Sequence, residues 1–178
     1  YRRALAGREA ALGHDHPDTL TSVGKLGNLL RARGDLAGAE PLLCRALAGY
    51  EAALGTDHSG TLTSVNNLAA LLHSKGDLAG AQSLYRRALA GREAALGPDH
   101  PETLVSVNNL ATLLQDRGDL AGAEPPYRRA VETAERVLGP EHPDTKIFRN
   151  NLRLLLETRA ADEGGEAETG GSLPPKGG

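Results

Sequence analysis

The sequence predicts an all-α fold, an α-solenoid built of antiparallel helical hairpins. Two patterns that return every 42 residues predict it. One is a block that begins His-Pro-Asp-Thr-Leu and returns with substitutions, starting at His16, His58, His100 and His142. The other is Gly-Asp-Leu-Ala-Gly-Ala, starting at Gly34, Gly76 and Gly118. A period between about 20 and 50 residues is typical of a stacked array in which no unit buries its apolar side chains alone. We therefore expect function on a surface rather than in a deep pocket.

The first helix of each unit, helix A, is predicted by apolar residues at helical spacing. In the second unit these residues are Leu62, Val65, Leu68, Ala69 and Leu72, which line one face at 3.6 residues per turn. The His-Pro-acid-Thr block marks the start, because proline is tolerated at the first helical position and an acid favours the positive end of the helix dipole. In the second unit Ser59-Gly60 replaces the Pro-acid pair, so we expect this junction to be the loosest.

The second helix of each unit, helix B, follows a Gly-Asp break. In the second unit Gly76 can adopt the left-handed conformation that ends a helix, and the carboxylate of Asp77 can cap the next one. Glycines recur inside helix B at Gly38, Gly80 and Gly122. We expect them to let neighbouring helices approach closely.

These signals divide the chain into an array of about eight helices and a tail. Residues 2–13 form a partial repeat. Helical hairpins are predicted over 17–55, 59–97 and 101–139, a terminal capping helix over 143–160, and a disordered acidic Gly/Pro-rich tail over 161–178. Arg153 occupies the position of the small residues Gly27, Ala69 and Ala111, and Ala160 replaces the Gly of the break. We therefore expect the array of 1–160 to stop there, because no helix B can pack closely against Arg153.

Composition excludes several classes of function. Residues 1–160 carry 19 basic and 19 acidic side chains, so the chain has no basic stripe for nucleic acid. No apolar run approaches the length of a membrane span. Cys44 is alone, so no internal disulfide can form and a cytoplasmic location is expected. The chain begins at Tyr1 in mid-repeat, which suggests a piece of a longer protein.

The sequence predicts no metal, no cofactor and no catalysis. Four of the six histidines share one repeat position, and equivalent residues of successive units should lie about 16 to 20 Å apart, too far for one zinc ion. His14-Asp15-His16 could hold a surface metal weakly, although a helix start explains these residues better. No nucleophile motif or phosphate-binding loop is present.

The residues of the second unit resemble tetratricopeptide repeats of the 42-residue kinesin-light-chain type. The resemblance rests on residues 62–72, Gly76-Asp77, Ala81, 84–89 and 96–101, and it extends over residues 1 to about 159. It implies a right-handed superhelix whose A helices line a concave groove. It also implies that the groove binds a protein or peptide partner.

The resemblance places a set of polar side chains in this groove. They are Lys25, Asn28, Arg31, Thr63, Asn66, Asn67, His73, Asn108, Asn109, Thr112 and Gln115. In kinesin light chains the Asn pair of helix A contacts the bound peptide, and a carboxamide suits a peptide backbone because it offers both a donor and an acceptor. The alternative is that one Asn of each pair bonds to the backbone of a neighbouring helix.

The first unit departs from the pattern, because Gly24-Lys25 replaces Asn-Asn. We hypothesise that Lys25 and Arg31 favour an acidic residue at that end of a ligand. The alternative is a pair of solvated charges.

The sequence thus predicts a protein-interaction scaffold. Two alternative functions stay open. One is a sensor arm that regulates a larger signalling NTPase, and the other is a structural array that self-associates end to end.

Overall fold

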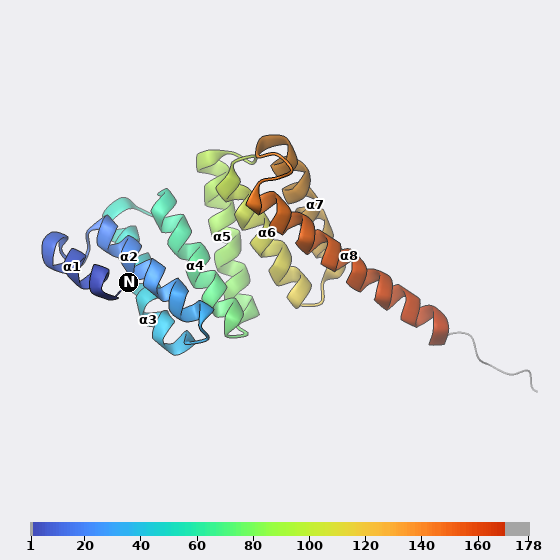
Figure 1. Cartoon of the computed structure of the whole chain (residues 1–178), viewed down its shortest axis with the longest axis horizontal. Helices are drawn as coiled ribbons and strands as arrows, with labels where there is room; N and C mark the ends of the chain where they lie inside the picture. Colours follow the sequence, from blue (N-terminus) through green and yellow to red (C-terminus); the bar gives the residue numbers. More distant parts are fainter. Residues whose placement is uncertain (1, 170–178) are drawn as a thin grey trace, which may run out of the picture.

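The computed structural model describes residues 2–169 as eight α-helices, with no strand in that range. The helices follow one another along an array from α1 at one end to α8 at the other (Figure 1). Their bounds are α1 Arg2–Leu12, α2 Pro17–Ala32, α3 Leu36–Leu54, α4 Ser59–Ser74, α5 Leu78–Leu96, α6 Pro101–Asp116, α7 Leu120–Val137 and α8 Pro143–Thr169. The A helices are α2, α4, α6 and α8, and the B helices are α1, which belongs to the partial repeat, α3, α5 and α7. The prediction of an all-α array is confirmed.

The repeated histidine caps every A helix. His16 Nδ1 accepts a hydrogen bond from the backbone N–H of Asp18 at 3.2 Å. His58, His100 and His142 accept the same bond at 3.1 to 3.2 Å. Because the first four N–H groups of a helix lack partners within it, this bond gives the histidine a structural role. Sequence analysis attributed the helix start to the proline and the acid, and missed the cap.

The start of α4, where we expected the loosest junction, is capped in the same way as its counterparts. Its cap His58 has the same backbone conformation as His16 and His100. Gly60 lies against the ring of Tyr50, and a Cβ atom at Gly60 would come within 2.8 Å of Tyr50 Cε1. Gly60 therefore reflects close packing against a tyrosine.

The Gly-Asp break has the predicted geometry. Gly76 has a φ of 82°, and Asp77 Oδ1 accepts a hydrogen bond from the N–H of Gly80 at 2.9 Å. A Cβ atom at Gly80 would lie 2.4 Å from Asp77 Oδ2. The glycine inside helix B thus makes room for the capping carboxylate, and our expectation that it serves helix approach was wrong.

The core of each unit is completed by the A helix of the next unit. Leu71 of α4 packs with Ala39 and Leu43 of α3. Leu113 of α6 is buried in the same way with Ala81 and Tyr85 of α5, and Leu155 of α8 joins the cluster of Ala123 and Tyr127. The apolar faces are therefore buried between units, as the period predicts.

Helix α8 continues past residue 160, where the sequence predicted its end. The other A helices end next to a glycine with positive φ, and Ala160 supplies no such break. The exposed face that would receive another helix B carries Arg149, which pairs with Glu135 at 2.6 Å, and Arg153, which pairs with Glu157 at 2.6 Å. The part of the predicted tail beyond Thr169 lies outside the described residues.

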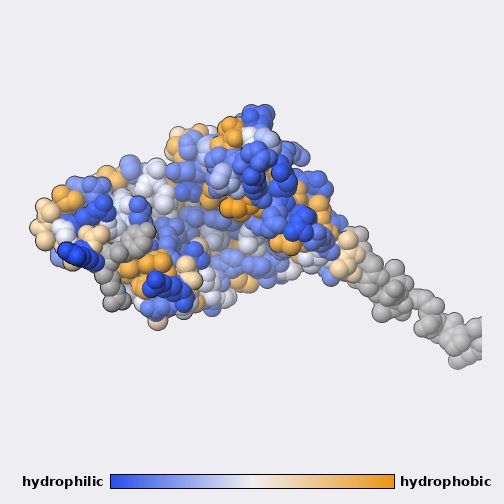
Figure 2. Space-filling model, viewed as in Figure 1, coloured by the Kyte–Doolittle hydropathy of each residue, from blue (hydrophilic) through white to orange (hydrophobic). Residues whose placement is uncertain are grey.

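The face of the molecule shown in Figure 2 mixes hydrophilic and hydrophobic residues along the whole array. The exposed large apolar side chains of the described residues are Leu12, Leu54, Val137, Ile147, Leu154 and Leu156. Three of them lie on α8, the last helix of the array. The remaining three, Leu12, Leu54 and Val137, are the last residues of α1, α3 and α7.

Two glycines at helix interfaces should respond oppositely to alanine. A Cβ atom at Gly24 would meet only Ala46 Cβ, at 3.9 Å, whereas one at Gly91 would lie 2.5 Å from Leu62 Cδ2, which is almost fully buried. We expect Gly24→Ala to stabilise the fold by about 0.5 to 1 kcal/mol through helix propensity. Gly91→Ala should destabilise it by about 1 to 3 kcal/mol through overpacking. Urea unfolding followed by circular dichroism measures both, and equal shifts for the two variants would contradict the packing described.

Candidate functional site

Side chains of neighbouring A helices are linked by a row of carboxamides. Asn109 Nδ2 of α6 donates to Asn66 Oδ1 of α4 at 3.1 Å, and Asn151 Nδ2 of α8 donates to Asn108 Oδ1 of α6 at 3.0 Å. The partners are 43 residues apart in both cases. We call this row the carboxamide ladder. It corresponds to the alternative in which an Asn bonds to a neighbouring helix, here through side chains rather than backbone.

A second row of polar contacts runs parallel to the ladder, nearer the carboxyl ends of the A helices. His73 Nε2 lies 2.7 Å from Asp116 Oδ2, and Arg31 Nη1 donates a long hydrogen bond of 3.5 Å to Ser74 Oγ. His73 and Arg31, both predicted to face a ligand, thus have partners on the neighbouring A helix.

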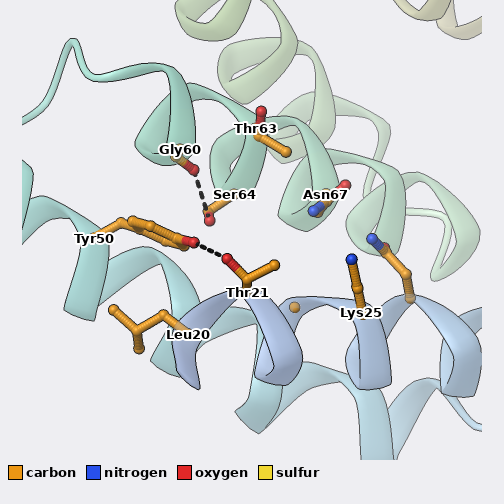
Figure 3. A pocket seen from close by; sticks show the side chains of 10 residues that line it. Leu20, Thr21, Lys25, Tyr50, Gly60, Thr63, Ser64 and Asn67 are labelled. Carbon is orange, nitrogen blue, oxygen red and sulfur yellow. Dashed lines mark hydrogen bonds between the residues drawn. The ribbon is translucent and has the colours of Figure 1, made fainter. Parts of the chain in front are cut away.

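The carboxamide ladder is interrupted between α2 and α4. The residue 43 positions before Asn67 is Gly24, which has no side chain to accept a bond. A pocket of about 330 Å³ opens at this place. We call it the groove pocket, and Figure 3 shows it from close by. Its lining comprises Leu20, Thr21, Gly24, Lys25, Asn28, Tyr50, Gly60, Thr63, Ser64 and Asn67.

The groove pocket combines an apolar part with unpaired polar groups. The ring of Tyr50 and the side chain of Leu20 lie at one end, and Lys25 and Asn67 face each other at the other end (Figure 3). Neither the Lys25 ammonium nor the Asn67 carboxamide has a hydrogen-bond or ion-pair partner among residues 2–169. Asn28 Oδ1 is buried and also lacks a donor within that range. The buried Asn28 oxygen is costly to the free protein, and the exposed Lys25 and partly buried Asn67 are available to a ligand.

The tyrosine of the groove pocket is held in place by hydrogen bonds. Its hydroxyl lies 2.6 Å from Thr21 Oγ1 and donates to the carbonyl of Pro17 at 3.0 Å. These bonds orient the ring against Gly60, so the apolar end of the pocket is preformed.

Arg92 occupies the corresponding position at the junction between α4 and α6. Its guanidinium donates to Ser106 Oγ at 2.8 Å, to the Glu102 carbonyl at 3.1 Å and to Thr63 Oγ1 at 3.1 Å. The side chain is only 5% exposed and lies 3.5 Å from the Glu102 carboxylate. Burial lowers the pKa of Arg92, and the charge of Glu102 opposes that shift. This junction is thus closed by an arginine and by the ladder.

Further predicted groove residues are bonded within the fold. The hydroxyl of Tyr127 lies 2.9 Å from Thr112 Oγ1 and 3.1 Å from Gln115 Oε1. Of the predicted residues, Lys25, Asn28 and Asn67 remain unpaired at the groove pocket, and the ligand role of the whole set stays a prediction. Tyr50 and Arg92 were not predicted from the sequence, although a comparison of this one repeat position across units singles out both.

The described residues suggest no metal centre and no membrane span. No group of three or more His, Cys, Asp or Glu side chains between residues 2 and 169 could hold a metal ion. Within the same range, no helix combines the length and apolar character needed to cross a bilayer.

The repeat geometry agrees with a known family. The sequence matches the tetratricopeptide repeat family over residues 1–52, 25–94 and 60–136. The chain belongs to this family. Tetratricopeptide repeats generally act as protein-interaction scaffolds and are typically not enzymes. No curated protein matches the sequence.

Solved tetratricopeptide repeat structures share the fold. BtubC (BKLC) from P. vanneervenii matches with a TM-score of 0.74 and 23% identity over 89% of this chain, which spans 63% of that protein. A Podosopora anserina protein, described as a kinesin light chain with nearly identical TPR-like repeats, matches with a TM-score of 0.69 over 93% of this chain and 79% of its own. A variant of the same protein has a TM-score of 0.70 and is covered over 78% of its length, and both are 23% identical to this chain. The kinesin-light-chain-like fold is therefore confirmed.

Removing Arg92 should destabilise the array. We expect Arg92→Ala to lower the free energy of unfolding by about 2 kcal/mol, because buried Ser106 loses its partner and a cavity forms. The matched control is Arg86→Ala, an exposed arginine of the same helix, which should change stability by less than about 0.5 kcal/mol. Chemical denaturation compares the two, and equal losses would show that Arg92 does not hold this junction.

Alkaline stability should depend on Tyr85. Burial raises the pKa of Tyr85 to about 12, while Arg31 opposes and Asp116 adds to the shift. An unfolded tyrosine titrates at about 10, so above that pH the unfolded chain loses a proton that the folded chain keeps. Stability should fall as pH rises from about 10 towards 12. Urea titrations between about pH 9 and 11.5 should show a smaller fall for Tyr85→Phe, and an identical fall would exclude this residue as the cause.

Proposed function

We propose that this tetratricopeptide repeat array is a scaffold that binds an extended segment of a partner protein along the face lined by its A helices, with the groove pocket as the anchoring point. The observation that carries the proposal is the break of the carboxamide ladder at Gly24, which leaves Asn67 without a partner beside a recess that the unpaired Lys25 also lines. Elsewhere on these helices the corresponding asparagines bond to one another.

The chemistry of the groove pocket suits a peptide. The free carboxamide of Asn67 can donate to a backbone carbonyl and accept from a backbone N–H, so it can pair with one peptide unit whatever the side chain. The end formed by Leu20 and the Tyr50 ring offers apolar surface for a side chain of that peptide. About 330 Å³ is at the lower limit of ordinary ligand pockets, which fits one side chain and its backbone.

An acidic ligand residue near the pocket is the second part of the proposal. Lys25 is exposed and no acidic side chain lines the groove pocket. Arg31 already contacts Ser74, so Lys25 should contribute more than Arg31 to any preference for acids.

A charge-reversal experiment tests the acidic preference. Peptides of about 12 residues are selected from a random displayed library on the wild-type chain, and their affinities are measured by fluorescence anisotropy. We expect Lys25→Glu with Arg31→Glu to weaken binding at least about tenfold in about 50 mM salt and by less in about 500 mM salt, because salt screens exposed charges.

The matched control reverses Arg3 and Arg86, two exposed arginines of B helices, and changes the net charge equally. It should leave the affinity within about twofold of wild type. If both double variants bind as the wild type does, the acidic preference is wrong.

The alternative roles, a sensor arm of a signalling NTPase and an array that self-associates end to end, stay predictions. A cytoplasmic location and the lack of nucleic-acid binding also stay predictions, because they rest on composition alone.

A further inference from the structure

We infer that Gly24 determines which pair of A helices anchors the ligand, and therefore the register of the ligand along the array. At the junction of α2 and α4 no carboxamide bond joins the two A helices, so we call it open; such a bond joins them at the other two junctions, which we call closed. The inference rests on the proposed function and deepens it. It makes Gly24 a specificity-determining residue, although Gly24 itself offers no functional group to a ligand.

The three junctions between A helices differ in the state of their carboxamides. Between α4 and α6, and between α6 and α8, each junction is bridged by a carboxamide bond of the ladder at 3.0 to 3.1 Å. Between α2 and α4, Asn67 has no partner across the junction. At a closed junction each bridging carboxamide has already used one N–H donor or one acceptor site in the ladder, whereas all the donors and acceptor sites of Asn67 are open to a ligand.

Neither backbone conformation nor packing requires a glycine at position 24. Gly24 lies inside α2 and is absent from the glycines with positive φ. An added Cβ atom would make one ordinary van der Waals contact, at 3.9 Å, with Ala46. Glycine inside a helix costs about 1 kcal/mol relative to alanine. Glycine at position 24 thus makes the helix less stable than alanine would, and it relieves no clash. Its structural effect is to leave the carboxamide of Asn67 without a partner.

Two further differences at the same junction enlarge the opening. Tyr50 occupies the repeat position of Arg92, and Gly60 occupies that of Glu102. Between α4 and α6 this arginine and glutamate form an ion pair at 3.5 Å, and the arginine also donates to Thr63. At the open junction the Tyr50 ring packs against Gly60 instead, and the pocket remains. Gly24, Tyr50 and Gly60, the three departures from the repeat, therefore all lie at the groove pocket.

Asparagine at position 24 should close the pocket. By analogy with Asn66 and Asn109, its Oδ1 would accept a bond from Asn67 Nδ2 and complete the ladder. The matched control is Gly24→Ala, which adds a Cβ atom without a carboxamide. Thermal unfolding followed by circular dichroism verifies that both variants are folded.

The binding experiment uses a peptide of about 12 residues selected from a random displayed library on the wild-type chain. We expect Gly24→Asn to weaken its binding at least about tenfold and Gly24→Ala to change it less than about threefold, because only the first variant engages a donor of Asn67 and places a carboxamide in the groove pocket. Asn151→Ala, which opens the ladder between α6 and α8, should leave the affinity within about threefold of wild type. Equal affinities for Gly24→Asn and Gly24→Ala would overturn the inference.

Nuclear magnetic resonance of the wild-type complex tests the register directly. Shifts induced by the peptide should centre on residues 20–28 and 60–67 and should be small at residues 105–109 and 147–151. Shifts centred on the second set would overturn the inference while leaving the proposed function intact. If the peptide shifts only B helices, or if no displayed peptide binds, the proposed function itself fails.

Discussion

The structure depends on one constraint: the core of a unit is closed by a leucine from the next one. Leu71, Leu113 and Leu155 are fully buried, yet each lies on the A helix that follows the unit whose core it fills. Successive A helices must therefore keep a constant spacing and rotation. Contacts between side chains 43 residues apart repeat along the array for this reason, both in the carboxamide ladder and in the row of His73 and Arg31.

The same constraint explains how far the sequence could be interpreted. The period, the helix starts and the Gly-Asp breaks depend on residues close together in the chain, and they were predicted to within a few residues. The capping role of His16 and its repeats was missed, because a capping bond depends on the side-chain rotamer, which no spacing reveals. The glycines of helix B were misassigned because the atom that would clash with a Cβ is the carboxylate of the preceding Asp, and neighbouring helices were considered instead.

The candidate site was less predictable than the fold. Helical spacing and the family resemblance placed a set of polar residues on one face, but they could not show which of the polar groups are satisfied by one another. Asn66 and Asn67 are adjacent and chemically identical, yet one bonds across a junction and the other has no partner because Gly24 lies opposite. Such distinctions require the contact between helices. The deviations from the repeat nevertheless converge on one place, since Gly24, Tyr50 and Gly60 all line the groove pocket.

The ladder joins each A helix to the next through residues 43 apart, and this regular spacing affects how such an array can evolve. A new unit copied in tandem from the second or third repeat carries Asn-Asn, so it would join its neighbours through closed junctions. Recombination could therefore add or remove such units without altering the junction between α2 and α4. In the proposed mode of binding, the length of the array and its recognition of a partner would then change independently of each other.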